Sequence, residues 1–390
     1  MQNQSTTPAV AIACGGTGGH LFPGLAVGQQ LTQHGCAVTL LVSPKEVDQL
    51  AVKTANGMEV VTLPAVGLTH GRWLRFLSGY CQSYWSARKL FQARPPHAVL
   101  AMGGFTSVPP VAAGRKFGAA TFLHESNTIP GKANRWLSRK VDRAFVGFPT
   151  AAFGLRTRRV LTTGTPVRTQ FQPKAAAICR ATLGLEPLRP VLLVMGGSQG
   201  ASAINELMLQ TLPRLVDRAP DLQLLHLAGS KDADKVRSQY AAHRLKAVVL
   251  PFLAEMEFAL GAATVAVNRA GASSLAELAA MRVPSVLIPL PTAADNHQFH
   301  NARAFEETGA ARLLDQGLAT AEALMGLILE LVENTATRGR MQAALEAWHS
   351  PRAAEQIAES IMAAITEKLR TKDHAPVAPA GIHKYQSVLT

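Results

Sequence analysis

The amino-acid sequence predicts an α/β protein in which mostly parallel sheets form two domains. Apolar segments of strand length alternate with helical segments, which is the pattern of parallel sheets covered by helices. A length of 390 residues suits two domains of ordinary size. With 47% hydrophobic and 17% charged residues, the chain can also bury substantial cores.

The strands are expected in two series, one in each half of the chain. The apolar runs of the first half are Val10–Ala13, Val38–Val42, Val60–Leu63, Ala98–Met102, Thr121–His124 and Arg143–Val146. Those of the second half are Val191–Met195, Leu222–Leu227, Ala247–Pro251, Val265–Asn268 and Ser285–Pro289. Helical stretches separate most of these runs, so each half predicts its own parallel sheet.

The segment Gly15–His20 directly follows the first strand and holds four glycines and a histidine. The glycines predict a tight turn, and Leu21–Thr32 is expected to form the next helix. The first N–H groups of a helix have no intrahelical partner and lie at the positive end of its dipole, so they bind anions. Histidine exchanges protons near neutral pH. Phosphate binding and acid–base chemistry are therefore predicted at one place.

Two other interpretations of this turn are weaker. A dinucleotide-binding loop would need a third glycine at position 21, which is Leu21, and an acidic residue after the second strand, where Ser43–Lys45 stands instead. A turn that only packs helix on strand would not need four glycines in five residues.

Four strands run into glycine-rich or small residues. These turns are Gly15–Gly19, Gly103–Ser107, Gly196–Gly200 and Gly271–Ser274. Open α/β sheets bind ligands at the carboxyl ends of their strands, where such turns lie. Since each half contains two of them, two facing domains would enclose a cleft for a phosphorylated ligand.

Composition narrows the functional class. Four widely spaced cysteines without a C-x-x-C pair indicate a reducing compartment and argue against a disulfide framework or a zinc site. No secretion signal or membrane-spanning segment is recognised. The formal charge of +13 calls for an anionic partner. No nucleic-acid motif is present, so a membrane surface and anionic substrates are favoured.

Seven segments in order resemble the MurG family of N-acetylglucosaminyltransferases, over about residues 8 to 365. The matching segments are Gly15–Gly24, Met102–Phe105, His124–Asn127, Gly164–Arg168, Gly196–Ala201, Arg269–Ala272 and Ala294–Gln298. The resemblance implies a GT-B fold, which is two Rossmann-like domains facing across a cleft. It also implies inverting transfer from UDP-N-acetylglucosamine to undecaprenyl-pyrophosphoryl-N-acetylmuramyl-pentapeptide (lipid I), forming the β-1,4 bond of lipid II, without a cofactor.

On this resemblance the chain divides into four parts. Residues 8–165 are expected to bind the acceptor and the membrane, and residues 166–346 to bind the UDP-sugar. The stretch 347–368 is expected to be a helix that returns to the first domain, and 369–390 a flexible tail. The boundary falls at Gly164–Arg168, where periodicity is lost.

His20 is the expected catalytic base, because an inverting transfer needs one group to deprotonate the acceptor hydroxyl. Glu125 is the alternative base, and a histidine that only orients a phosphate or the acceptor is the alternative role. The leaving diphosphate would be stabilised by helix termini, Ser198 and Arg168.

The donor site is expected mainly at a helix N-terminus after Val265–Asn268, capped by Ser273 and Ser274. Glu277 would accept hydrogen bonds from the ribose hydroxyls, unless it only complements the helix dipole. The resemblance further implies that Asn127 and Gln298 contact the sugar and that the Leu253 backbone contacts uracil. The alternative for Gln298 is a capping interaction with Asp295. The full predicted UDP-sugar set is Thr17, Gly18, Gly19, Asn127, Arg168, Ser198, Leu253, Ala272, Ser273, Ser274, Leu275, Ala276, Glu277 and Gln298.

No metal is expected. The Asp-x-Asp pair of Asp232 and Asp234 has the spacing of a metal site in some glycosyltransferases, but flanking lysines favour a solvated helix start.

A basic and aromatic segment predicts docking on anionic lipid, on the cytoplasmic face of the plasma membrane. Its residues are Arg72, Trp73, Leu74, Arg75, Phe76, Leu77 and Trp85. The alternative is an ordinary amphipathic helix that packs inward.

Two further functions stay open at this point. A GT-B transferase could act on another lipid acceptor, such as a diacylglycerol. A non-catalytic nucleotide-sugar sensor at the membrane could share the same binding residues.

Overall fold

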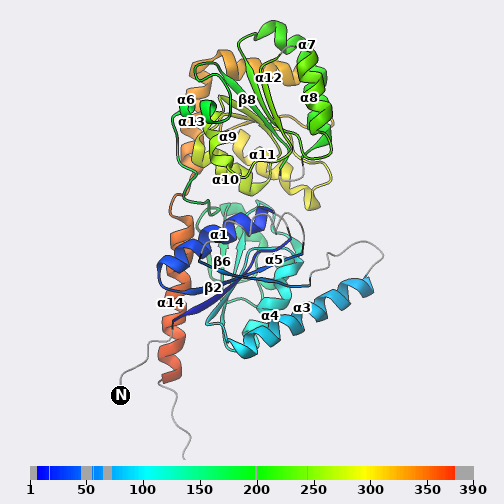
Figure 1. Ribbon diagram of the computed structural model, residues 1–390. Coiled ribbons are helices and arrows are strands. Elements are labelled where there is room, and N and C mark those ends of the chain that lie inside the picture. Colours follow the sequence, from blue (N-terminus) through cyan, green and yellow to red (C-terminus); the bar gives the residue numbers. More distant parts are fainter. Residues whose placement is uncertain are drawn as a thin grey trace, which may run out of the picture.

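The computed structural model folds into two α/β domains, one above the other in Figure 1. It describes residues 7–16, 18–44, 55, 57–64, 73–197, 200–243 and 245–373. All strand pairs of both sheets are parallel. The predicted class, two α/β domains with parallel sheets, is therefore confirmed.

The N-terminal domain is built on a sheet of order β3-β2-β1-β4-β5-β6-β7. Its strands are β1 (Ala9–Ala13), β2 (Ala37–Val42), β3 (Glu59–Thr62), β4 (Ala98–Ala101), β5 (Ala120–Glu125), β6 (Arg143–Val146) and β7 (Val160–Thr162). The strand order reverses between β1 and β4, and a crevice for ligands opens at such a point beyond the carboxyl ends of the strands.

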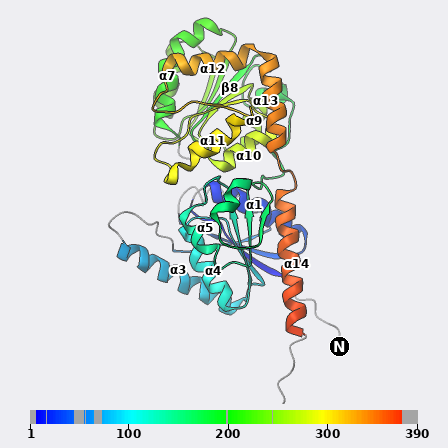
Figure 2. The ribbon, with the colours of Figure 1, turned by 180° about the vertical axis from the view of Figure 1, so that it is seen from behind.

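Helices cover both faces of this sheet (Figure 2). They are α1 (Gly18–Gln33), α3 (Trp73–Ala93), α4 (Val108–Lys116), α5 (Lys132–Leu137) and α14 (Ala353–Asp373), with short 3-10 turns η1 (Phe105–Ser107) and η2 (Pro149–Gly154). Side chains of β1 alternate between two cores. Val10 and Ile12 pack with α1 and α14, whereas Ala11 and Ala13 belong to the core under α3, α4 and α5.

The C-terminal domain repeats this plan with a sheet of order β10-β9-β8-β11-β12-β13. Its strands are β8 (Val191–Met195), β9 (Gln223–Leu227), β10 (Ala247–Leu250), β11 (Val265–Asn268), β12 (Ser285–Leu287) and β13 (Arg312–Leu313). Its helices are α6 (Ala176–Thr182), α7 (Ser202–Arg218), α8 (Ala233–Ala242), α9 (Met256–Ala262), α10 (Ala272–Met281), η3 (Ala294–Asn296), α11 (His297–Glu307), α12 (Ala321–Glu333) and α13 (Thr335–Trp348). The reversal here lies between β8 and β11.

The last helix returns to the N-terminal domain, alongside α1 (Figure 1). Ile357, Ile361 and Ile365 recur every four residues, and all three are buried in the N-terminal core. The helix continues to Asp373 rather than ending at Lys368, since residues 369–373 contain no helix breaker. The start of the predicted tail at 369 is thus corrected, and residues 374–390 lie outside the described chain.

The chain passes between the domains twice. It leaves the first sheet after Thr162 and enters the second core at Phe171, and it crosses back between Trp348 and Ala353. The limits 8–165 and 166–346 and the roles given to the two domains stay predictions.

The sequence missed some local details. Gly18, Gly19 and His20 were expected in the turn, but they form the first turn of α1, because Gly16 with φ +117° already makes the reversal. Strands β7 and β13 were not expected, because three and two residues are too short for a periodic signal.

Candidate functional site

A cavity of about 860 Å³ lies between the two domains. Its N-terminal wall is formed by the start of α1 and the segments after β4 and β5. Its C-terminal wall comes from the segments after β8, β9, β10 and β11 and from the start of α11. Because the carboxyl ends of both sheets face the cavity, their strand-end turns meet there, as the four predicted turns require.

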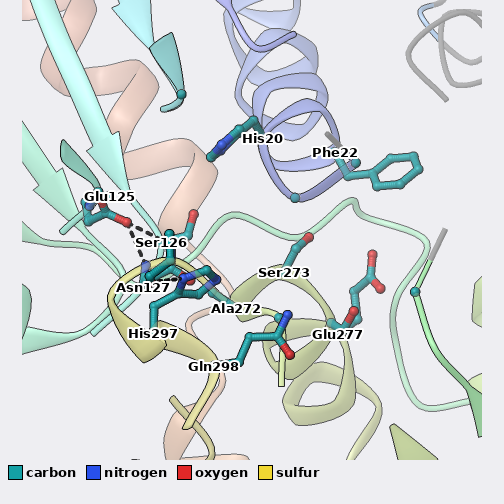
Figure 3. Close-up of a pocket in the computed structure, with 18 of the residues that line it drawn as sticks. His20, Phe22, Glu125, Ser126, Asn127, Ala272, Ser273, Glu277, His297 and Gln298 are labelled. Atoms are coloured by element: carbon teal, nitrogen blue, oxygen red, sulfur yellow. Dashed lines mark hydrogen bonds between the residues drawn. The ribbon is translucent and has the colours of Figure 1, made fainter. Parts of the chain in front are cut away.

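His20 projects from the first turn of α1 toward the cavity (Figure 3). The ring packs against the turn after β4. A Cβ atom placed on Gly103 would lie only 2.6 Å from Cε1 of His20. Gly103 and Gly104 also have backbone φ values of +120° and +74°, which residues with a side chain rarely adopt. These glycines therefore leave the space that the imidazole occupies.

Glu125 lies at the end of β5, 3% exposed, and its carboxylate is fully engaged (Figure 3). Its Oε1 accepts from the backbone N and Nδ2 of Asn127, at 2.9 and 3.0 Å. Its Oε2 accepts from the backbone N of Gly131 and from Nδ2 of Asn134, both at 2.9 Å. Glu125 therefore fastens the loop 126–131 that forms part of the cavity wall.

His124 is completely buried behind this loop. Burial lowers the pKa of its imidazole to about 4, so the ring is neutral at pH 7. Nε2 lies 3.1 Å from the carbonyl oxygen of Gly164, and Nδ1 lies 3.2 Å from Oγ of Ser126. A neutral ring can donate to that carbonyl and accept from the hydroxyl, so it fastens the loop to the interdomain crossing.

On the opposite wall, α10 points its N-terminus at the cavity. Gly271 is the N-cap residue, and no side chain caps the helix, so the predicted capping by Ser273 and Ser274 is wrong. The extended conformation of Gly271 (φ −67°, ψ 133°) puts both serines inside the first turn instead. The first intrahelical bond is Leu275 N to Gly271 O at 3.0 Å. The preceding N–H groups are therefore available to an anion.

Glu277 lies one turn into α10 and lines the cavity. Burial raises the pKa of its carboxyl to about 7, although Arg168 opposes this shift with Nη2 3.8 Å from Oε1 of Glu277. Arg168 itself is 5% exposed. Its guanidinium carbon lies 4.4 Å from the ring centre of Phe22 and 4.9 Å from that of Phe171. Arg168 thus lies behind Glu277, held between rings of both domains.

Gln298 lies in the first turn of α11, where its Oε1 accepts from the backbone N of Leu290 at 3.0 Å. Its alternative capping partner, Asp295, instead pairs with Arg135 of the N-terminal domain at 2.5 Å. Next to Gln298, Nδ1 of His297 lies 2.8 Å from the carbonyl oxygen of Ala294 and donates to it. This bond leaves Nε2 as the second functional nitrogen of His297.

Most of the predicted site residues line this one cavity. They are Gly18, Gly19, His20, Glu125, Asn127, Leu253, Ala272, Ser273, Ser274, Glu277 and Gln298. Three others in the described chain do not line it: Arg168, Leu275 and Ala276. Leu275 is 1% exposed and belongs to the domain core. Thr17 and Ser198 lie outside the described residues.

The cavity also contains residues that sequence reasoning did not select. These include Phe22, Phe105, Ile129, Lys132, Met256, Asp295 and His297. Phe22, Phe105, Asp295 and His297 lie inside segments that match the family, so their side chains could have been found there. Ile129 and Met256 lie outside those segments and give no separate signal, because the same residue types also fill the domain cores.

Within the described chain, no group of three or more histidine, cysteine or acidic residues could hold a metal. Asp232 is the N-cap residue of α8, and its Oδ2 accepts from Nδ2 of Asn205 at 2.9 Å. The absence of a metal in the reaction stays a prediction.

The predicted membrane segment belongs to α3, which has two faces. Ala87 and Phe91 are buried in the N-terminal core, with Tyr80 and Tyr84 against it. Leu74, Leu77 and Trp85 are 66%, 44% and 59% exposed, and Arg88 lies 4.9 Å above the Trp85 ring. Phe76 packs edge-on against Phe105 at 5.5 Å. Arg72 and the side chains of Trp73 and Arg75 lie outside the described residues. No described helix combines the length and hydropathy of a membrane span.

Family models match both domains. Residues 10–146 match the glycosyltransferase family 28 N-terminal domain, and residues 191–357 match the family 28 C-terminal domain. Two relatives are named UDP-N-acetylglucosamine–N-acetylmuramyl-(pentapeptide) pyrophosphoryl-undecaprenol N-acetylglucosamine transferase. The one from Sorangium cellulosum is 38% identical over 90% of this chain and 87% of its own length. The one from Geobacter sp. strain M21 is 35% identical over 93% and 96%.

A crystal structure of MurG from Acinetobacter baumannii is also similar. It matches with a TM-score of 0.70 and 28% identity, over 92% of this chain and 99% of that one. The GT-B organisation and the resemblance inferred from the seven sequence segments are confirmed. The chain therefore belongs to glycosyltransferase family 28 and, within it, to the MurG family.

Proposed function

We propose that the interdomain cavity transfers N-acetylglucosamine from UDP-N-acetylglucosamine to the lipid-linked acceptor undecaprenyl-pyrophosphoryl-N-acetylmuramyl-pentapeptide. The product is lipid II, with a β-1,4 bond and an inverted anomeric centre. One observation carries this proposal. An imidazole on one wall lies across the same cavity from a helix N-terminus with a carboxyl group one turn in, at His20, α10 and Glu277. The relatives that share both domains carry the corresponding names.

The C-terminal wall binds the donor. The N–H groups at the start of α10, on Ala272, Ser273 and Ser274, bind the diphosphate. The Glu277 carboxylate accepts hydrogen bonds from the two ribose hydroxyls, and the backbone at Leu253 contacts the uracil. Gln298 and Asn127, from opposite walls, contact the sugar. The contact predicted between Arg168 and the diphosphate needs a side-chain movement, because its guanidinium here faces Glu277.

His20 is the better of the two candidate bases. Both carboxylate oxygens of Glu125 already accept two N–H bonds each, so this residue is committed to the loop 126–131. His20 lies at the cavity surface with its ring placed by Gly103 and Gly104. In the proposed step His20 takes the proton of the acceptor 4-hydroxyl as its oxygen bonds to the anomeric carbon. The bond from that carbon to the diphosphate breaks, and UDP leaves with the electron pair, stabilised by α10.

The outer face of α3 docks the enzyme on the cytoplasmic side of the plasma membrane. Leu74, Leu77 and Trp85 lie on one helical stripe that ends at Arg88, so apolar side chains are followed by a cation. A second exposed aromatic residue, Trp136, lies 4.1 Å below the Nζ of Lys140. Such pairs suit a boundary between anionic head groups and acyl chains.

An acceptor competition tests the reaction. Purified protein is given UDP-N-acetylglucosamine with a lipid I analogue, a diacylglycerol, or both, in detergent or lipid. We expect UDP release with the lipid I analogue. Release only with diacylglycerol would indicate another lipid acceptor. Donor binding without turnover under any condition would indicate a nucleotide-sugar sensor.

A vesicle assay tests membrane docking. The double variant Leu74→Asp/Trp85→Asp should sediment less with vesicles of anionic phospholipid, while turnover of a water-soluble acceptor analogue stays the same. Leu188→Asp is the matched control, because Leu188 is 92% exposed but lies in the other domain. Equal sedimentation of the double variant and the wild type would contradict docking through α3.

A further inference from the structure

Asn301 joins the two walls of the cavity from a completely buried position on α11. Its Oδ1 accepts from the backbone N and from Oγ1 of Thr128, in the N-terminal domain, at 2.9 and 3.0 Å. Its Nδ2 donates to Oδ1 of Asn127 at 3.0 Å and to the carbonyl oxygen of Ala270 at 3.1 Å. One amide thus bonds to the loop after β5 and to the residue before the N-cap of α10.

These partners fix the orientation of the Asn301 amide. The backbone N of Thr128 can only donate, and the carbonyl oxygen of Ala270 can only accept. A flipped amide would place nitrogen against nitrogen and oxygen against oxygen. The orientation is therefore set from both domains, and all four hydrogen-bonding positions are used.

Asn301 in turn orients Asn127. The Nδ2 group of Asn127 donates to the Glu125 carboxylate, which can only accept. Its Oδ1 accepts from Nδ2 of Asn301. Asn127 is held between an acceptor in its own domain and a donor in the other, which leaves one N–H and one lone pair of its amide for a ligand.

We propose that Asn301 is a positioning residue that holds the Asn127 amide in the orientation needed for sugar transfer, through hydrogen bonds that exist only when the two domains are together. This inference rests on the proposed function for its kinetic consequence. Its structural part, the control of the loop 126–131 from α11, does not. Asparagine is required because one end of the side chain must accept and the other must donate.

Two substitutions test this requirement. Asn301→Ala removes all four bonds, and Asn301→Asp keeps an acceptor for Thr128 but puts an oxygen against two other oxygens. We expect kcat to fall at least tenfold in both variants, while the Kd for UDP stays within about threefold, because the α10 N-terminus remains. Asn334→Ala is the matched control. It removes a helix-capping hydrogen bond in the same domain, in which Thr337 N donates to Asn334 Oδ1 at 2.9 Å. The melting temperature should therefore change, and kcat should not.

A double-mutant cycle separates positioning from a general loss of structure. If Asn301 acts through Asn127, Asn301→Ala should change kcat less than twofold in an Asn127→Ala background. The same tenfold loss in both backgrounds would overturn the proposal. So would an unchanged kcat of Asn301→Ala, or a loss of UDP affinity as large as the loss of kcat.

Hydrogen exchange separates this inference from the proposed reaction. In Asn301→Ala, amides of residues 126–131 should exchange at least tenfold faster, whereas the core strands β8 and β11 should not change. If the wild type transferred no sugar yet the loop responded, the proposed function would fail and the cross-domain control would stand. Unchanged amide exchange in residues 126–131 would contradict the inference, whatever the transferase activity of the protein. Thr128→Val, which removes one of the four bonds, should give a smaller change of the same kind.

Discussion

The two walls of the cavity share a sheet plan but hold their functional groups in different ways. On the N-terminal wall, side chains are fixed by hydrogen bonds and close contacts: four N–H groups, two of the backbone and two of side chains, bind Glu125, and two glycines leave the space for His20. On the C-terminal wall, α10 begins at Gly271 without a side-chain cap and presents backbone N–H groups. Backbone groups recognise any phosphate, whereas fixed side chains can perform chemistry on one hydroxyl.

This difference has a consequence for mutants. Changes to His20 and its supporting residues on the N-terminal wall should reduce turnover and spare nucleotide binding, and changes to α10 on the C-terminal wall should do the reverse. Asn301 lies on α11 but orients Asn127 of the other wall, so its substitutions should reduce turnover. A residue that behaved in the opposite way would contradict this separation of turnover from nucleotide binding.

The largest effect is expected from the base. His20→Ala should lower kcat about a hundredfold or more, because the acceptor hydroxyl loses its proposed base while the alternative base, Glu125, is committed to the loop 126–131. UDP affinity should stay nearly the same. Turnover measured by UDP release and binding measured by calorimetry check both parts. His34→Ala is the control, since His34 is exposed just beyond the other end of α1. Normal turnover of His20→Ala would remove this residue from the role of base.

A smaller effect on kcat is expected when the space around the His20 ring is filled. Gly103→Ala places a Cβ 2.6 Å from Cε1 of His20 and also strains a backbone at φ +120°. The ring must move, so kcat should fall about tenfold with UDP affinity unchanged. Gly35→Ala isolates the strain, because Gly35 has φ +80° but no atom within 4 Å of its would-be Cβ. Equal kcat in the two variants would show that the contact with His20 is not needed.

The sequence predicted more of the fold than of the site's internal bonding. An uninterrupted apolar run marks strands such as Val191–Met195, whose bounds agree with the structure. Short strands such as β13 carry too few residues for a period. Strand-end turns pointed to the positions of His20 and Glu277, which line the cavity, and the resemblance to the MurG family supplied the role predicted for Glu277.

Pairings across the chain leave no local pattern. Asn301 bonds to Thr128, 173 positions away, and nothing near Asn301 in the sequence signals this contact. Arg168 carries the charge suited to a diphosphate, but its place behind Glu277 depends on the packing of Phe22 and Phe171. Such arrangements follow from tertiary structure alone.

The C-terminal wall can be tested by pH. Glu277 has a pKa of about 7, so its carboxylate, the form that accepts from ribose, increases as pH rises from 6 to 8. Affinity for UDP-N-acetylglucosamine should therefore rise about tenfold over this range. Glu277→Gln should bind more weakly at pH 8 and lose this dependence, with calorimetry as the measurement. An identical pH profile in the variant would assign the titration to another group.

The smallest effect is expected from the exposed link between the walls. Arg135 and Asp295 form a 2.5 Å ion pair across the domains, with side chains 42% and 35% exposed. Exposed pairs contribute about 0.2–1 kcal/mol and are screened by salt. Arg135→Gln should therefore change kcat less than about twofold, with a water-soluble acceptor so that membrane binding does not intervene, and added salt should remove the difference. A tenfold loss that persists in salt would mean that the surface pair, and not only the buried amide of Asn301, aligns the two walls.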